Sequence, residues 1–172
     1  MESPAERVAA APSEGATLHI ESKRFGTLDV PEDRVFRFES GLIGFPASRN
    51  FVLLDHKPGS PFKWMLSLED PELAFAVADP IDLVADYDPP MKRASKQLHA
   101  DEADVAIFAL VTIPKDPTEM TINLMAPVAV DLKSMAAEQL ILDRPDLSPA
   151  HPVVPIKSET TSEPAGASGA EG

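Results

Sequence analysis

The sequence predicts an all-β fold, a small β-barrel-like or sandwich domain of about ten short strands with one short helix. Two observations predict it. Apolar or alternating runs of strand length recur along the chain, and prolines and glycines separate them. Long segments with helical periodicity do not alternate with these runs, so the parallel sheet of an α/β fold is not indicated.

The first half of the chain supplies six of the expected strands. Leu18 and Ile20 alternate with polar residues, as in a half-buried strand, and a partner strand follows Lys23-Arg24 and ends at Pro31. Two further runs, joined by the turn residues EDPE, predict a hairpin that contains the one tryptophan of the chain. The strands expected in this half are 17–21, 25–30, 34–38, 50–55, 62–68 and 73–78.

The second half supplies the helix and four more strands. Residues 91–100 are the best helix candidate, because they combine good helix formers with the absence of Gly and Pro. Residues 79–90 are acidic and contain prolines, so we expect an irregular segment there. Pro127 separates two strands and indicates a bulge or an edge position. The strands expected in this half are 104–113, 119–126, 128–132 and 138–142.

The ends of the chain differ in composition from its middle. Residues 1–16 and 144–172 contain many small, polar and Pro residues and offer little apolar surface to bury. We therefore expect a disordered N-terminal extension and a mostly disordered C-terminal tail. The middle, residues 17–143, is long enough for one domain with a hydrophobic core.

The chain is acidic, with a formal net charge of −13. Between residues 17 and 143 there are 12 Lys and Arg against 21 Asp and Glu, so the expected domain carries most of the excess. Seven carboxylates and no basic residue lie between Leu66 and Pro90. Such a surface repels phosphate backbones and attracts a basic protein, which argues for a protein partner and against direct nucleic-acid binding. The alternative explanation of the charge is that it only keeps the protein soluble.

The cysteine count, the N-terminus and the length of the apolar runs indicate the cellular compartment. The absence of cysteine excludes disulfides and thiolate metal sites. The N-terminus has no apolar core of a signal peptide, and no apolar run is long enough to span a bilayer. We expect a cytoplasmic protein with no membrane segment.

Catalytic motifs are absent from the sequence. There is no phosphate-binding glycine loop and no nucleophile elbow, and the acidic pairs lie in expected turns rather than in a predicted cleft. We therefore expect a non-enzymatic protein with no cofactor and no metal; a hydrolase that uses clustered carboxylates is a remote alternative. The four histidines stand singly, without the spacing of metal ligands: His19, His56, His99 and His151.

The tryptophan shares one face of its expected strand with two other apolar residues. We expect Phe62, Trp64 and Leu66, together with Phe75, to form the core of the barrel. An exposed Trp64 that anchors a partner is the alternative, because tryptophan is enriched at binding hot spots.

The sequence SPFKWMLSLEDPELAFAVADP at residues 60–80 follows GLIGFP and FVLLDH, and VAIFALVTIPKDPTEMTINLMAPVAV and QLIL come later. In their order and spacing, these segments resemble the flagellar assembly factor FliW family. The resemblance covers residues 17–143. His151-Pro152 is similar to the family's usual ending, whereas KSMAAE at residues 133–138 is nearly neutral where the family usually carries a basic stretch.

The resemblance implies a cytoplasmic β-barrel-like protein that acts by partner switching. FliW-type proteins bind newly made flagellin, and they bind the translational repressor CsrA and block its action on flagellin mRNA. Flagellin that accumulates withdraws FliW from CsrA. A flagellin-specific chaperone or secretion adaptor without a translational role is the alternative, and in either case we expect a monomer.

The two partners suggest two sets of contact residues. CsrA is a basic protein, so we assign it to the acidic segment, with Glu69, Asp70, Glu72, Asp79 and Asp82 as candidates. Flagellin would offer an amphipathic helix that requires an apolar groove, and its candidates are Phe45, Phe62 and Ile113.

Overall fold

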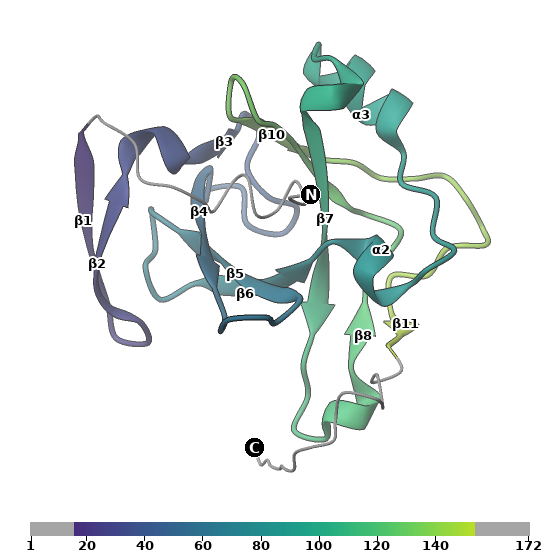
Figure 1. Ribbon diagram of the computed structural model, residues 1–172, viewed down its shortest axis with the longest axis horizontal. Helices are drawn as coiled ribbons and strands as arrows, with labels where there is room; N and C mark the ends of the chain where they lie inside the picture. The colour runs from purple at the N-terminus through teal and green to yellow at the C-terminus, as the bar shows by residue number, and fades with distance from the viewer. Residues whose placement is uncertain (1–15, 154–172) are drawn as a thin grey trace.

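Seven strands close into a barrel at the centre of the computed structural model, which describes residues 16–153 (Figure 1). The strands follow one another around the barrel in the order β7-β6-β5-β4-β3-β10-β9, and β9 pairs with β7 to complete it. All neighbours are antiparallel except β10 and β3, which are parallel. The strands of the barrel are β3 (Phe36–Phe38), β4 (Asn50–Asp55), β5 (Phe62–Ser67), β6 (Ala74–Ala78), β7 (Val105–Thr112), β9 (Val128–Asp131) and β10 (Ala136–Gln139).

Further elements cover the barrel from two sides. A separate hairpin of β1 (Thr17–Ser22) and β2 (Gly26–Pro31) lies on one side, and the helices α2 and α3 lie on the other (Figure 1). Two short strands extend the sheet from β7, and short helices fill the connections. These elements are β8 (Thr121–Ile122), β11 (His151–Pro152), α2 (Pro80–Leu83), α3 (Met91–Leu98), η1 (Glu32–Arg34), η2 (Glu102–Asp104) and η3 (Pro117–Glu119).

The core therefore has three parts. One face of each barrel strand points inward, and these residues form an interior cluster that includes Phe36, Phe38 and Phe51. The hairpin buries Ile20 and Val30 against the outer face of β4 and β5. A third cluster lies between the outer face of β6, β7 and β9 and the segment that carries α2 and α3. Because both faces of several strands are covered, these strands are apolar on both faces.

The expected positions of Phe62, Trp64 and Leu66 inside the barrel are wrong, because all three belong to the clusters outside it, and of the four expected residues Phe75 alone packs against the interior cluster. Met65 is the residue of β5 that belongs to the interior cluster, whereas Trp64 is half-buried on the outer face. The guanidinium of Arg24, from the β1–β2 turn, lies 4.1 Å from the Trp64 ring centroid, within the range of a cation–π interaction. Trp64 Nε1 donates to His56 Nδ1 at 3.3 Å, and burial, with Lys57 and Arg24 nearby, lowers the pKa of His56.

Most predicted elements are confirmed. The all-β class holds, the hairpin of β5 and β6 forms, and the expected helix forms as α3, which ends where His99 adopts a left-handed conformation (φ 55°). The strand expected at 119–126 is reduced to β8, because the Asn123 side chain accepts from the Met125 and Ala126 N–H groups and turns the chain. The segment 79–90, expected to be irregular, contains the single turn of α2.

The chain continues to contribute to the fold after residue 143. His151 in β11 pairs with Ile122 in β8, and Leu147 and Val153 are buried in the cluster beneath the helices. The boundary expected at residue 143 thus falls ten residues before the end of the described fold. Residues 1–15 and 154–172, which hold most of the expected disordered ends, lie outside the described residues. Among the described helices, none has the length and apolar character that crossing a bilayer requires.

Candidate functional site

The barrel has two ends, and strand register assigns each candidate residue to one of them. In the β5–β6 hairpin, Leu66 pairs with Ala74 next to the turn, and Phe62 pairs with Ala78 at the opposite end. The β3–β4 connection lies on the turn side, because the Leu68 N–H donates to the Asn50 carbonyl at the start of β4. We call the turn side the Phe45 end, which comprises residues 39–49, 68–73 and 139–141. We call the opposite side the Phe62 end.

The structure brings some of the candidate residues together and separates the others. The turn residues Glu69, Asp70 and Glu72 lie at the Phe45 end with Phe45 itself. Ile113 follows the end of β7 on the same side, because Val111 pairs with Ala76. The remaining three, Phe62, Asp79 and Asp82, lie at or beyond the opposite end of the hairpin. The five acidic candidates therefore form two groups, one at each end of β6.

Glu69 joins the β5–β6 turn to the start of β4. Its carboxylate accepts from the Arg49 and Asn50 backbone N–H groups at 3.1 and 3.0 Å and from Asn50 Nδ2 at 2.6 Å. Partial burial alone would raise the pKa of Glu69, but the hydrogen bonds from Asn50 and Arg49 outweigh it and hold the pKa below its usual value. Glu69 is thus ionised and immobilised at neutral pH.

The other two acidic residues of this turn also have structural partners. Asp70 Oδ1 accepts from the Glu72 N–H at 3.1 Å, which shapes the turn. Glu72 Oε2 accepts from the Lys23 N–H at 2.9 Å and so links the β5–β6 turn to the β1–β2 turn. Both side chains remain exposed. Their negative charge is consequently presented to solvent from a braced turn.

At the Phe62 end, Asp79 has a different role. Its carboxylate accepts from the Ile81 N–H at 3.1 Å and caps the N-terminus of α2. Burial raises the pKa of Asp79, and the neighbouring charge of Asp82 adds to this against the opposing hydrogen bond from Ile81. Asp82 is exposed on α2. Asp79 thus caps α2 and Asp82 lies in its first turn, at the end of β6 opposite the β5–β6 turn.

The apolar candidates differ in exposure. Phe45 is 40% exposed and packs edge-on against Phe75, with ring centroids 5.1 Å apart. Ile113 is 45% exposed. Phe62 is half-buried against the cluster under the helices, so it offers less surface than the other two.

Sequence analysis missed two exposed residues at the Phe45 end. Ile43 is 52% exposed and Ile141 is 58% exposed. Ile43 lies in the same GLIGFP segment as Phe45, so its position in a short, glycine-flanked apolar run was the available signal. Ile141 stood in a run that predicted a strand, QLIL, and only the structure shows that its two leucines are buried while the isoleucine is not.

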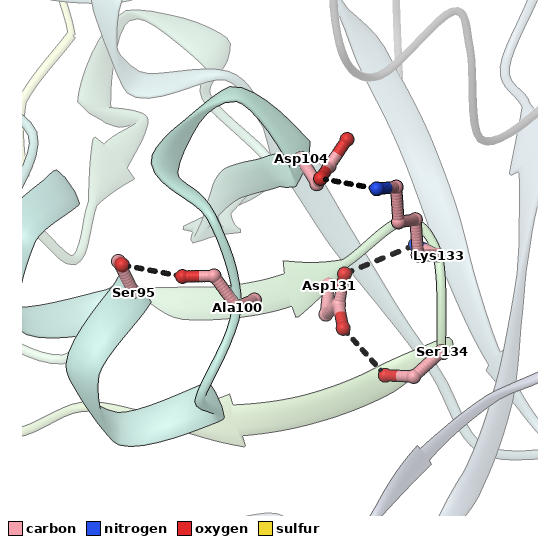
Figure 2. Close-up of polar contacts among 6 residues, drawn as sticks. All are labelled: Ser95, Ala100, Asp104, Asp131, Lys133 and Ser134. Atoms are coloured by element: carbon pink, nitrogen blue, oxygen red, sulfur yellow. Dashed lines mark hydrogen bonds and ion pairs between the residues drawn. The ribbon is translucent and has the colours of Figure 1, made fainter.

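The β9–β10 turn, which lacks the basic stretch expected from the resemblance, is stabilised by Asp131 (Figure 2). The Asp131 carboxylate accepts from the Lys133 N–H at 3.0 Å and from the Ser134 hydroxyl at 2.6 Å. Burial would raise the pKa of Asp131, but these hydrogen bonds outweigh it and lower the pKa. Lys133 Nζ lies 3.3 Å from Asp104 Oδ2 (Figure 2). The polar side chains here stabilise the turn.

Metal-binding geometry is not found in the part of the chain that the structure describes. No group of three or more His, Asp or Glu residues is arranged to hold an ion there. The turn carboxylates Glu69 and Asp70 accept from backbone amides, as expected of residues that shape turns. The arrangement at the Phe45 end is that of a rigid, acidic and partly apolar surface.

Comparisons with known proteins agree with this architecture. The family model described as "FliW protein" matches residues 19–153. A crystal structure of the flagellar assembly factor FliW superimposes with a TM-score of 0.72 at 28% identity, and the match covers 81% of this chain and 99% of that chain.

Curated relatives match over most of their own length. A flagellar assembly factor FliW of Magnetococcus marinus is 37% identical over 141 residues, which cover 80% of this chain and 86% of the relative. A protein of the same name from Heliobacterium modesticaldum is 33% identical over 145 residues, which cover 83% of this chain and 95% of the relative.

Proposed function

This chain belongs to the FliW family of flagellar assembly factors, and from this premise we propose that it acts by partner switching between flagellin and the translational repressor CsrA. In this function it is a non-enzymatic, monomeric, cytoplasmic regulator. Bound to CsrA, it prevents CsrA from repressing translation of flagellin mRNA. When flagellin accumulates before export, flagellin binds the protein and releases CsrA.

The observation that supports this proposal best is the composition of the Phe45 end. Exposed carboxylates of Asp70 and Glu72 lie there on a braced turn, at the same end as the exposed ring of Phe45. Fixed negative charge favours encounter with a basic protein, and an exposed apolar ring favours an amphipathic helix. One end of the barrel therefore offers both chemistries that the two partners require.

The acidic charge also supports a mechanism for antagonism. A protein of net charge −13 that docks on CsrA places negative charge near the RNA-binding surface and repels phosphates, whether or not it covers that surface. Negative charge at the contact has a measurable signature, because exposed charges raise the association rate and make it sensitive to salt.

The experiment is a titration of the purified full chain with CsrA and with flagellin. We expect each partner to bind and each to displace the other, with CsrA binding weakening as salt rises. Failure of both partners to bind folded protein at low salt contradicts the proposal. Flagellin binding without CsrA binding supports the chaperone or adaptor function instead.

Charge-neutral variants separate the two acidic groups. Asp70→Asn preserves a side-chain acceptor for the turn, and Asp82→Asn removes one charge at the opposite end of β6. We propose that Asp70→Asn weakens CsrA binding and reduces its salt dependence. If only Asp82→Asn does so, the contact lies at α2. If neither does, the acidic segment is a solvated surface.

A further inference from the structure

We propose that the Phe45 end of the barrel is a receptor for a helical segment that inserts an apolar side chain beside Ile43, packs on the exposed ring of Phe45 and places a Lys or Arg against Glu39 and Glu138. The inference rests on the proposed function, since the segment belongs to the helical partner named there. It adds the residues of the site and the chemistry of the segment.

The first argument is that the apolar residues at this end are exposed on a rigid turn. Leu42 and Phe45 form a β-bridge, with the Phe45 N–H donating to the Leu42 carbonyl at 2.7 Å. The turn residues between them are Ile43 and Gly44, and Gly44 has φ +89°. Leu42 is buried in the barrel interior, so the turn is anchored while Ile43 and Phe45 face solvent.

Contacts from other segments hold the same turn in place. The Ile43 N–H donates to Gln139 Oε1 at 3.0 Å, and Gln139 Nε2 in turn donates to the Ala126 carbonyl at 3.0 Å. At Gly41 a Cβ atom would lie 2.5 Å from the Pro46 carbonyl oxygen, so the backbone closes tightly here. Two exposed apolar side chains on a pinned turn are pre-organised for binding, because little side-chain or backbone freedom is lost when a partner docks.

The second argument is the cavity beside this turn. It has a volume of about 260 Å³, and its apolar lining includes Phe38, Leu42, Ile43 and Ala137. Phe45 lies outside this lining and packs on Phe75, so its exposed ring is a contact surface next to Ile43 in the turn. Pockets for whole small ligands usually measure about 300–1,000 Å³. The cavity therefore suits an inserted side chain of a protein better than a complete small molecule.

The third argument is charge. Glu39 and Glu138 line the cavity, and no Lys or Arg does among the residues described around it. Glu69 does not line this cavity, but its carboxylate adds negative charge where it accepts from the Arg49 and Asn50 amides at the end of the same loop. A segment with an apolar side chain and a flanking Lys or Arg would fill the cavity with the first and pair the second with Glu39 and Glu138. An amphipathic helix supplies that combination at i, i+3 and i+4 spacing.

Charge also distinguishes this occupant from a second copy of the chain. A symmetric contact places the same surface patch on both sides. Two copies docked through this cavity would bring Glu39 and Glu138 of one protomer toward those of the other, which is unfavourable. A basic segment from a different protein meets no such repulsion.

The test uses the full chain and, as probe, the C-terminal helical segment of flagellin, with affinity measured by calorimetry. We expect Ile43→Ser and Phe45→Ser each to weaken binding about tenfold or more, as truncation of a central apolar contact does. Ile81→Ser is the matched control, because Ile81 is a similarly exposed isoleucine (47%) on α2 at the other end. It should leave affinity within about twofold of the parent chain, on the scale of residues outside a hot spot.

A charge-neutral variant tests the contribution of the carboxylates that line the cavity. Glu138→Gln should lower affinity severalfold and reduce its dependence on salt, while leaving Ile43 in place. A probe in which Lys and Arg are replaced by Gln should bind the parent chain and Glu138→Gln equally.

The outcomes separate this inference from the function on which it rests. Binding by the parent chain that is unchanged in the Ile43, Phe45 and Glu138 variants overturns the inference and leaves partner switching intact. No binding of the probe by the folded parent chain overturns the inference, and partner switching is overturned as well only if full-length flagellin and CsrA also fail to bind. A concentration-dependent dimer that Ile43→Ser abolishes assigns the cavity to a second copy and overturns the inference as well.

Discussion

Asn50 Nδ2 and Glu69 Oε2 lie 2.6 Å apart, and this contact ties the β5–β6 turn to the first residue of β4. Two backbone amides, from Arg49 and Asn50, donate to the other oxygen of the same carboxylate. Glu69 is therefore a structural part of the Phe45 end as well as a source of its negative charge.

Replacing Glu69 should consequently lower stability. Glu69→Ala leaves three donors without their acceptor, and since solvent reaches them we expect a loss of about 1–2 kcal/mol in the free energy of unfolding. Urea denaturation measures it. Glu119→Ala, at an exposed carboxylate in η3, is the control and should change stability by less than about 0.5 kcal/mol. Equal effects of the two changes would contradict a structural role for Glu69.

Gly41 should be the least replaceable of the glycines with positive φ. Gly41→Ala imposes a left-handed conformation on alanine, at a cost of about 1–2 kcal/mol, and also drives its Cβ into the Pro46 backbone. Gly59→Ala carries the same conformational cost at φ +80° with nothing within 4 Å of the added atom. The difference in unfolding free energy between the two variants isolates the steric part. If Gly41→Ala is no worse than Gly59→Ala, the turn is not closed as tightly as the structure has it.

Asp131 should make stability depend on acidic pH. Its pKa is lowered in the folded protein, so its stabilising contribution is present above the ordinary pKa of about 3.8 and disappears as pH falls through the lower folded value. We expect unfolding free energy to decline below about pH 4. Asp131→Asn should be less stable than the parent at pH 7, and the difference should shrink as pH falls below the ordinary pKa of about 3.8. A constant difference across this range would exclude the titration of Asp131 as the cause.

Asp79 should behave in the opposite way. Its pKa is raised by burial, so ionising it costs more in the folded than in the unfolded protein, and stability falls as pH rises through the ordinary value toward the raised one. Asparagine caps helices as well as aspartate does. Asp79→Asn should therefore equal or exceed the parent in stability at pH 7. A clear loss at pH 7 would show that the ionised carboxylate contributes more as a cap than its burial costs.

Trp64 provides a spectroscopic probe of the hairpin, because it is the one tryptophan in the chain. Arg24→Ala removes the guanidinium that lies 4.1 Å from its ring centroid, so we expect a shifted emission maximum and a loss of about 0.5–1 kcal/mol. Lys23→Ala is the matched control. It removes one positive charge from the neighbouring residue and keeps the backbone N–H that donates to the Glu72 carboxylate. Indistinguishable spectra for both variants would contradict the stacking of Arg24 on Trp64.

Local sequence patterns predicted the elements whose hydrogen bonds are local. The β5–β6 hairpin was predictable because two strand-like runs flank a short turn that contains Pro71. The helix α3 was predictable because residues 91–98 lack helix breakers. The short strand β8 was not, because the Asn123 side chain competes with the sheet for backbone amides, and composition does not reveal that competition.

The placement of the candidate residues could be predicted only in part. That Glu69 and Asp70 share a turn follows from the sequence itself. That Phe45 lies at the same end of the barrel depends on the pairing of β3, β4 and β5, and the contact between Ile43 and Gln139 joins residues 96 positions apart. Such contacts depend on the closure of the barrel, so no local sequence pattern predicts them.

By itself, the sequence determined the all-β class, the acidic character and the family resemblance, because alternation, turn residues and charge are local properties. Only the tertiary structure decided which face of β5 is the interior. Both faces of that strand are apolar, since Met65 packs inside the barrel and Trp64 packs under Arg24 outside it. The tertiary structure also decided that exposed Phe45 and ionised Glu69 share one end, because that depends on strands brought together by closure of the barrel.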